Sequence, residues 1–363
     1  MADTPLRVIV WGTGGIGSIA IPAIQRRPGM ELVGVWVHSD SKVGEDAGAL
    51  ANGEAIGLAA TNDVDALMAL QPDCIVYTAN ARDSVAVEDY DRFLRAGIDV
   101  VSTSAVGAIY PPVYRPKSRD KIVAAAEAGG TTFYASGIEP GFAADHLPIL
   151  LTTNSISVRS VHSYEIGLYD DYPVASTMMD GMGFGRPLDF ESGFTKPGAI
   201  SHSWAGQVQY VADVLEVDLD DVREVYERVE TPRDLHVACG TIPAGTCGAL
   251  RIQVIGVVGG EDAIVLDHVT RMAPDLAPQW PTGPHPVTYR VEIEGDPNIT
   301  CDLGFAVDDA AKLGIVGMAA GAGAMVATAM RVVNAVPYVV EARPGLLSSL
   351  DLPMTAPRGA FGV

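Results

Sequence analysis

Short apolar runs alternate with amphipathic helical stretches through the first 150 residues. Five runs have the length and the β-branched or aromatic content of buried strands: Arg7–Trp11, Glu31–Val37, Cys74–Thr78, Ile98–Ser102 and Thr132–Ala135. The helical stretches between them stop at glycine-containing signals such as Pro28-Gly29 and Gly129-Gly130. Apolar strands that alternate with helices predict an α/β fold with a doubly wound parallel sheet covered on both faces.

The pattern changes after about Leu151, where the strand-like runs become longer. They are Ser157–Leu168, Leu250–Val258, Ala263–Met272, Val287–Glu294 and Ile299–Phe305. Two pairs of these runs are joined by turn sequences typical of hairpins, Gly259–Asp262 and Gly295–Pro297. We therefore predict a second, α+β domain with a largely antiparallel sheet and helices around Ser176–Met182 and Trp204–Val214.

One segment, Leu313–Met330, carries no charged residue and is long enough to span a bilayer. It is rich in glycine and alanine, no basic cluster flanks it, and a helix that is apolar all round is also found in the middle of large proteins. We interpret an apolar helix from about Asp308 to Val333 as a buried helix. The tail after Pro344 reads as an irregular surface strap.

Charge and cysteine content narrow the classes of partner. The chain has 24 basic and 45 acidic residues, a formal net charge of −21. Such a field repels nucleic acid and anionic lipid, so we expect neither nucleic acid nor membrane as a partner. The four cysteines lack metal-ligand spacing, so no metal site is predicted. The N-terminus has no signal-peptide pattern, and we expect a cytoplasmic protein.

A glycine loop follows the first strand directly and opens the first helix. It reads Gly12, Thr13, Gly14, Gly15, Ile16 and Gly17. In this context the first glycine permits a tight turn, the second lets the backbone approach a diphosphate, and the third allows close helix–strand packing. The alternative is a strand–helix turn without a ligand. We predict a Rossmann domain over 1–150, completed by 308–345, that binds NADP or NAD, and a substrate-binding domain over 151–307.

The end of the second predicted strand bears on the choice of coenzyme. An acidic residue is expected there, some 20 residues after the loop, if NAD is preferred. Instead the strand ends at His38 and Ser39, with Lys42 just beyond, a set that suits a 2′-phosphate. Asp40 leaves NAD possible, and we favour NADP. Further coenzyme contacts are expected where later strands end, at Thr78, Ala79, Asn80 and Thr103.

Three more strings accompany the glycine loop. They are Gly137–Phe142 followed by Asp145–Pro148, the run Glu165–Tyr172, and Val333–Pro337 followed by Pro344–Leu346. With these motifs in this order, the chain from about Arg7 to Pro353 resembles the family of 2,4-diaminopentanoate dehydrogenase and the native amine dehydrogenases. That family has a dihydrodipicolinate-reductase-type N-terminal domain.

The resemblance implies an activity and several site residues. The activity is NAD(P)-linked oxidation of a CH–NH2 carbon to a carbonyl with release of ammonia, or the reverse. By position, Tyr169 and Tyr172 resemble the aromatic residues that shape the amine pocket, and Asn334 matches an asparagine near the nicotinamide. The resemblance also implies that the second domain supplies the substrate pocket and a homodimer contact.

One departure from the family concerns the proton-handling group. Amine-active members usually carry a glutamate after the strand that ends here at Ser102, but 102–110 contain no acid. Glu139, which follows a strand and precedes Pro140-Gly141, is the candidate replacement as catalytic acid or base, or else the substrate is different. The alternative role for Glu139 is to cap a helix that begins near Ala143.

The candidate residues of the second domain also have structural alternatives. Tyr169 and Tyr172 either donate hydrogen bonds to a substrate or only wall its pocket. His162 and Glu165, which flank Tyr164 on one strand, share a face or point to solvent. The Met-rich stretch Met178–Met182 favours an apolar, adaptable pocket.

Three functions fit these features. The first is an NAD(P)-dependent oxidoreductase of a small, mainly apolar amine or ketone. The second is an ammonia-independent NADPH-dependent carbonyl or imine reductase. The third is a non-catalytic dinucleotide-binding sensor.

Overall fold

The computed structural model describes residues 4–194, 196, 198–316 and 321–361. The chain forms two compact units. The first contains the residues up to Gly141, then Asp309–Ile315 and the residues from Met325 onward. The second contains Phe142–Asp308 and a stretch that ends at Ala324. The first division therefore lies nine residues before the predicted one at 150, because helix α6 (His146–Thr152) belongs to the second unit.

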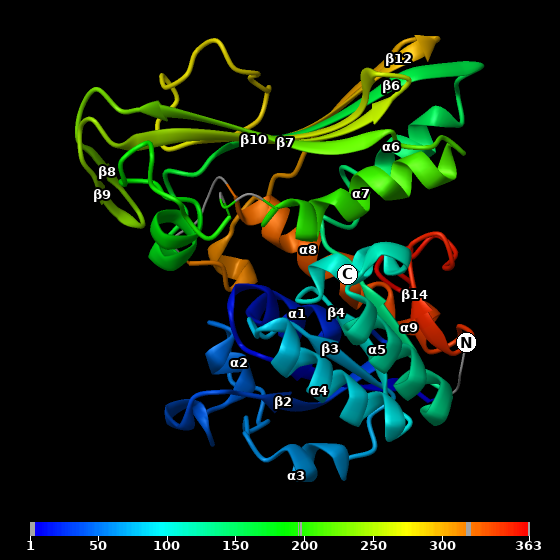
Figure 1. Cartoon of the computed structure of the whole chain (residues 1–363). Coiled ribbons are helices and arrows are strands. Elements are labelled where there is room, and N and C mark those ends of the chain that lie inside the picture. The colour runs from blue at the N-terminus through cyan, green and yellow to red at the C-terminus, as the bar shows by residue number, and fades with distance from the viewer. Residues whose placement is uncertain (1–3, 195, 197, 317–320, 362–363) are drawn as a thin grey trace. The chain divides into compact units, whose positions relative to one another are not determined.

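The first unit is built on a six-stranded parallel sheet with the order β14-β5-β4-β3-β1-β2 (Figure 1). Its strands are β1 (Leu6–Trp11), β2 (Met30–Trp36), β3 (Cys74–Tyr77), β4 (Asp99–Ser102), β5 (Thr132–Ala135) and β14 (Gly345–Leu347). The chain leaves β1 toward β2 and then returns to the other side of β1 for β3. Ligands of open parallel sheets bind at such a reversal, beyond the carboxyl ends of the strands. The predicted doubly wound parallel sheet is confirmed.

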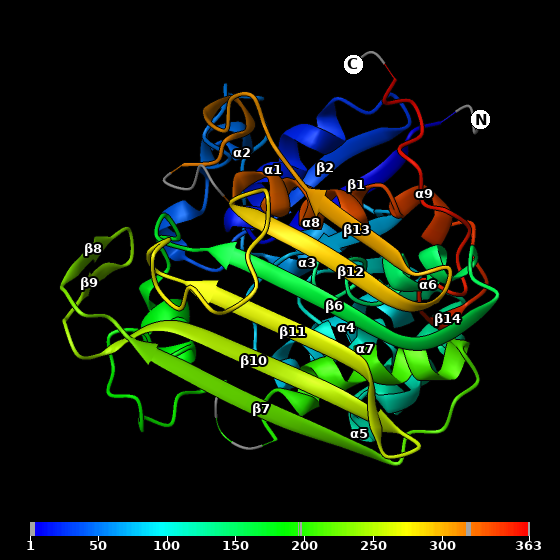
Figure 2. The same cartoon turned by 90° about the horizontal axis from the view of Figure 1, so that it is seen from above.

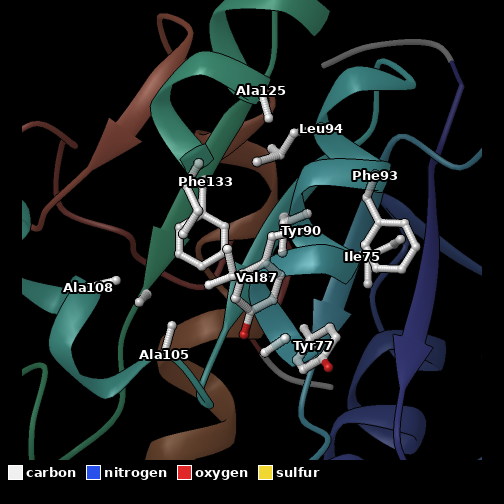
Figure 3. Packing of buried hydrophobic residues seen from close by; sticks show 14 of the residues in the cluster. Ile75, Tyr77, Val87, Tyr90, Phe93, Leu94, Ala105, Ala108, Ala125 and Phe133 are labelled. Carbon is white, nitrogen blue, oxygen red and sulfur yellow. The ribbon is translucent and has the colours of Figure 1, made fainter. Parts of the chain in front are cut away.

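Helices cover both faces of this sheet. They are α1 (Gly15–Gln25), α2 (Ala47–Leu50), α3 (Val64–Met68), α4 (Asp83–Arg95), α5 (Pro116–Gly129), α8 (Ala322–Val333) and α9 (Val336–Val339). Residues of α3, α4 and α5 pack on one face, where Tyr90 of α4 contacts Phe133 of β5 with ring centroids 4.6 Å apart (Figure 3). Residues of α1, α8 and α9 pack on the other face. Val85 of α4, although apolar, is 54% exposed.

The C-terminal region differs from the prediction in two ways. The predicted helix over 308–333 is broken: a 3-10 turn covers Ala311–Leu313, and α8 begins at Ala322, after a gap (317–320) outside the described residues. The predicted surface strap contains β14, which pairs in parallel with β5 as an edge strand of the sheet. A three-residue strand leaves no periodic signal of its own, because its pairing partner lies some two hundred residues earlier.

The C-terminal part of the apolar helix packs into the core of the first unit. Within the described part of the chain, Ala322–Val339 is the one stretch long and apolar enough to cross a membrane. Val332 and Val333 of α8 and Val336 of α9 are fully buried in the cluster that also contains Val8 and Val10 of β1. The same composition that would suit a membrane here supplies one face of a protein core.

The second unit is built on a six-stranded mixed sheet with the order β13-β12-β6-β11-β10-β7 (Figure 2). Its strands are β6 (Ser157–Leu168), β7 (Asp221–Glu230), β10 (Cys247–Val258), β11 (Glu261–Arg271), β12 (Val287–Asp296) and β13 (Ile299–Gly304). Only β6 and β11 pair in parallel, so the predicted, largely antiparallel sheet with its two hairpins is confirmed. The prediction missed β7 and the small hairpin of β8 (Leu235–Val237) and β9 (Gly240–Ile242).

Helix α7 (Ser201–Val214) packs against β7, β10 and β11 and defines one face of this sheet. Trp204 of α7 stacks on His268 of β11 with ring centroids 5.1 Å apart. Because side chains alternate along a strand, Glu165 of β6, which is in register with His268, lies on this same face. We call it the α7 face.

Candidate active site

The glycine loop is shaped by contacts that exclude a Cβ at two positions. Gly12 has φ +104°, and a Cβ there would lie 3.0 Å from the Cα of Ala79. A Cβ on Gly17 would lie 1.9 Å from the carbonyl oxygen of Gly12. These two glycines are therefore required by the protein's own packing at the start of α1.

Gly14 is different, because a Cβ there would meet no atom of the described chain within 4 Å. Gly14 and Gly15 are exposed, and Gly14 is the N-cap of α1 without a side-chain capping bond. The start of α1 is thus open to an incoming ligand at Gly14. A helix N-terminus of this kind binds phosphate groups, so the cradle fits the diphosphate of a dinucleotide.

A lysine lies next to this cradle. Lys42 Nζ donates to Thr13 Oγ1 at 3.2 Å, although Lys42 follows β2 and Thr13 follows β1. His38 and Ser39 are exposed at the end of β2. The carboxylate of Asp40 accepts a hydrogen bond from Asn62 Nδ2 at 2.9 Å. The structure therefore brings a cation, rather than a carboxylate, to the glycine loop from the end of β2.

The residues after β3 and β4 lie at the same edge of the sheet. Thr78 Oγ1 donates to the carbonyl oxygens of Trp11 and Gly12, each at 3.2 Å, so its side chain stabilises the turn of the glycine loop. Ser104 Oγ donates to the carbonyl of Ala79 at 2.6 Å and ties the two loops together. Asn80 is exposed and Thr103 is half-buried, and both remain candidates for coenzyme contact. Ile16 is half-buried in the first turn of α1.

The position of Asn334 requires a correction. Its Oδ1 accepts from Arg27 Nη2 at 3.0 Å. Arg27 lies beyond the C-terminal end of α1, and Gly29 accepts from the backbone N–H of Leu6 at the start of β1. Asn334 is therefore at the amino edge of the sheet, and the length of α1, about 16 Å, separates it from the glycine loop. The family resemblance implied a place for Asn334 near the nicotinamide. Because α8 runs beside α1, however, its last residues lie far from the carboxyl edge of the sheet, where the glycine loop is.

Glu139 lies in a short loop that follows β5 at the carboxyl edge. Ser136 Oγ donates to the Gly141 carbonyl at 3.2 Å, and Arg331 of α8 lies 3.4 Å from the same hydroxyl oxygen. Asp145 is the N-cap of α6 and accepts from the His146 N–H, so capping of this helix, the alternative predicted for Glu139, is done by another residue. The Glu139 side chain is half-buried.

A second group of ionisable side chains lies on the α7 face of the second unit. Tyr169 donates its hydroxyl to Glu165 Oε1, and His268 Nε2 is 3.3 Å from the same oxygen. His268 Nδ1 lies 3.0 Å from Thr270 Oγ1. The ring of Tyr172 is 5.8 Å from that of Tyr169. We call Glu165, Tyr169 and His268 the Glu165 cluster.

The environment of the cluster shifts the pKa values of its carboxyl and phenol groups. Burial raises the pKa of Glu165, but the attraction of a protonated His268 and the hydrogen bonds from His268 and Tyr169 outweigh it, so this pKa lies below its usual value. Burial and then the negative charge of Glu165 raise the pKa of Tyr169 well above that of a free phenol. Burial also raises the pKa of Tyr172. The cluster is thus an ionised carboxylate that accepts a hydrogen bond from a neutral phenol.

Sequence reasoning missed part of this cluster. His268 and Trp204 were not candidates, and Glu165 was expected to share a face with His162 or to face solvent. The strand alternation separates them: His162 contacts Tyr164 and Asp267 on the opposite face, whereas Glu165 is buried on the α7 face. The register of β6 with β11, which unites Glu165 and His268, has no local signal in the sequence. Among the described residues no group of three or more His, Cys, Asp or Glu side chains is placed to hold a metal ion.

Comparison with known proteins identifies the family. Residues 142–360 match the model of the 2,4-diaminopentanoate dehydrogenase C-terminal domain, and residues 12–136 match that of the homoserine dehydrogenase NAD-binding domain. An amine dehydrogenase of Streptomyces virginiae is 36% identical over 98% of this chain and 99% of its own. A 2,4-diaminopentanoate dehydrogenase of Acetoanaerobium sticklandii is 25% identical over 98% of this chain and 95% of its own.

The solved structures share the fold. That of an amine dehydrogenase from Mycobacterium smegmatis matches with a TM-score of 0.79 at 20% identity, over 99% of both chains. A probable dehydrogenase from Thermotoga maritima matches with a TM-score of 0.55 at 11% identity, over 95% of this chain and 92% of its own. Together with the glycine cradle, the matched sequences confirm the predicted resemblance: the chain belongs to the family of 2,4-diaminopentanoate dehydrogenase and the amine dehydrogenases and is an NAD(P)-dependent oxidoreductase.

Proposed function

We propose that this protein is an amine dehydrogenase that interconverts a small, mainly apolar amine with the corresponding ketone and ammonia, and that it prefers NADP(H) to NAD(H). The observation that carries the proposal is the open glycine cradle with Lys42 beside it, in a chain 36% identical along its length to an amine dehydrogenase.

The coenzyme preference is argued from the charges at the end of β2. The backbone of Gly12–Gly17 would hold the diphosphate, and Lys42, with His38 and Ser39, would hold the 2′-phosphate. An ammonium group is suited to a phosphate as a point charge. One oxygen of the Asp40 carboxylate accepts a hydrogen bond from Asn62 instead of facing the glycine loop as Lys42 does.

The reaction needs an acid–base group as well as the coenzyme. An amine, water and the oxidised coenzyme give a ketone, ammonia, the reduced coenzyme and one proton; the bound coenzyme supplies the hydride acceptor. The protein has to move protons at the nitrogen and at the water that adds to the imine carbon. We assign this role to Glu139 on the strength of its place after β5, and assign Tyr169 and Tyr172 to the substrate region of the second unit.

The apolar character of the substrate is argued from the second unit. Met178 and Phe184, in and after the π-helical turn Ser176–Gly181, are buried, and the ring of Tyr172 lies beside that of Tyr169. Methionine and aromatic side chains make adaptable apolar pocket walls.

We also infer a cytoplasmic homodimer, on the family resemblance and the acidic composition. Light scattering should give a mass twice that of one chain, and a monomer at all concentrations would contradict the dimer.

One assay separates the three candidate functions. Purified protein is given NADPH and a series of methyl ketones, with and without ammonium. Loss of NADPH that requires ammonium supports the amine dehydrogenase. Loss without ammonium would assign the protein to the carbonyl reductases, and tight NADPH binding with no turnover would leave a sensor.

A further inference from the structure

The loop that carries Glu139, residues 136–141, is closed tightly on itself. Ser136 Oγ donates to the Gly141 carbonyl at 3.2 Å and so joins the two ends of the loop. Gly141 has φ +124°, and a Cβ there would lie 2.3 Å from the backbone nitrogen of Gly137. Because the loop is this compact, the contacts that hold it also determine where Glu139 lies.

Helix α8 contacts this loop at two positions about one helical turn apart. Thr328 Oγ1 accepts from the Ile138 N–H at 3.4 Å. Arg331, three residues later and therefore on the same side of the helix, donates through Nε to the hydroxyl that closes the loop and through Nη2 to the Gly141 carbonyl, at 3.4 and 3.5 Å. These contacts fall before and after Glu139 along the chain, so α8 holds the loop on both sides of the proposed acid–base residue.

Arg331 is an unusual residue for its place in the sequence. It is half-buried, and it directly follows the stretch Leu313–Met330, which has no charged residue. A partly buried guanidinium is costly unless its N–H groups are hydrogen-bonded. Nη2 also donates to the Tyr134 hydroxyl of β5 at 3.4 Å. Each of these bonds is longer than a typical N–H···O bond, so the loop is held by several contacts together rather than by one.

We propose, resting on the assignment of Glu139 above, that Arg331 is a positioning residue for the proton-transfer step. With Thr328 it holds residues 136–141 so that the Glu139 carboxylate lies where the reaction needs it, and in this role it acts only through Glu139. Without Arg331 the loop is displaced, and a displacement of about 1 Å can lower a rate by about 100-fold.

A double-mutant cycle tests whether Arg331 acts through Glu139. With saturating ketone, ammonium and NADPH, Arg331→Ala should lower kcat by about 10–100-fold. The KM for NADPH should stay within about two-fold, because the glycine cradle is not altered. In the Glu139→Gln background the same change should lower kcat by less than about three-fold, since no carboxylate is left to position.

The other outcomes of the cycle are distinct. Losses that multiply in the double variant overturn the positioning role and leave the amine dehydrogenase function intact. A wild-type rate for Glu139→Gln alone shows that the assignment of Glu139, and with it this role of Arg331, is wrong. Absence of ammonium-dependent turnover in the wild type contradicts the proposed function itself and the role that rests on it.

Added guanidinium separates positioning from a loss of stability. Guanidinium chloride, well below the concentration that unfolds the protein, should raise the kcat of Arg331→Ala several-fold, because the free cation can occupy the place of the missing side chain. Sodium chloride at the same ionic strength should not. A variant that is only destabilised would lose activity in guanidinium instead.

Arg7→Ala is the matched control. Arg7 Nη2 donates to the Leu70 carbonyl at 2.9 Å, at the amino edge of the same sheet. Arg7→Ala should lower Tm but leave kcat unchanged and unaffected by guanidinium. The positioning role is overturned if guanidinium restores no activity to Arg331→Ala and its kcat falls no further than that of Arg7→Ala.

Thr328→Val covers the case in which Arg331→Ala does not fold. Valine keeps the branched shape of threonine and removes only the hydroxyl that accepts from Ile138. We expect kcat to fall by about 2–10-fold, the effect of one hydrogen bond, and no fall in the Glu139→Gln background. A wild-type kcat for Thr328→Val, or an equal loss in both backgrounds, contradicts the proposal.

Discussion

The two candidate sites of this protein are built in opposite ways. The glycine loop is six consecutive residues whose function lies in their backbone, and its shape is set by contacts such as that between Gly17 and the Gly12 carbonyl. The Glu165 cluster is made of side chains from β6, β11 and the chain after β6, and its members are up to 103 residues apart, from Glu165 to His268. A contiguous backbone site can be identified in a sequence, whereas an assembled side-chain site requires the strand register.

The largest effect is expected from a methyl group inside the glycine loop. Gly17→Ala places a Cβ 1.9 Å from a backbone oxygen, which cannot move without opening the turn. We expect a loss of roughly 3 kcal/mol of unfolding free energy and a fall in Tm of about 6–12 °C. Coenzyme binding, measured by fluorescence titration with NADPH, should be lost.

The matched variant Gly14→Ala tests whether the open side of the loop faces the ligand. Its Cβ meets no protein atom within 4 Å, so Tm without coenzyme should stay within about 1 °C of the wild type. NADPH affinity should nevertheless fall by about 10-fold or more, since the Cβ keeps the diphosphate from the backbone. Unchanged affinity would show that the coenzyme does not approach at Gly14.

Next in size is the effect of removing the proposed acid–base group. Glu139→Gln should lower kcat by about 100-fold or more, the usual contribution of general acid–base catalysis, with little change in NADPH affinity. Steady-state kinetics with saturating ammonium measure both quantities. Glu127→Gln, at an exposed position on α5, is the control and should retain full activity. A wild-type rate for Glu139→Gln would remove this residue from the mechanism and direct attention to the Glu165 cluster.

A smaller effect is expected at the end of β2. Lys42→Ala should weaken NADPH binding by about 10–100-fold, the range of a hydrogen bond to a charged group, and leave NADH binding within about two-fold. Lys117→Ala, an exposed position on α5, is the control for a change in net charge. Equal losses for the two coenzymes would mean that Lys42 supports the loop through Thr13 rather than recognising the 2′-phosphate.

The difference between contiguous and assembled features also explains which parts of the fold could be predicted. The parallel sheet of the first unit and the hairpins of the second follow from local apolar runs and turn residues. The edge strand β14 could not be predicted, because Gly345–Leu347 is defined only by pairing with β5. Strand β7 was missed because Asp221–Glu230 is mostly charged, as is common in strands at a sheet edge.

The same reasoning applies to single residues. Val85 fits the helical pattern of α4 yet is exposed, because the buried stripe of that helix runs through Ala86, Tyr90 and Phe93. Asn334 follows the last residue of α8, and its distance from the glycine loop depends on the direction in which α8 runs beside α1. Neither packing angle nor helix direction is encoded in a local pattern.

The smallest effect concerns the charge of the Glu165 cluster. The lowered pKa of Glu165 determines whether the stability of the protein rises or falls with pH. A carboxyl whose folded-state pKa lies below its unfolded value, near 4.5, contributes stability fully above that pH and loses it as the pH falls through the folded value. The wild type should therefore have a higher Tm than Glu165→Gln at neutral pH, and the gap should narrow as the pH falls below 4.5.

Thermal melts from neutral to acidic pH measure this gap. Parallel curves for wild type and Glu165→Gln would show that Glu165 is not preferentially ionised in the folded protein. The cluster would then stabilise the protein through packing alone. It would still differ from the glycine loop in being assembled from distant residues, but it would not contribute an ionised group.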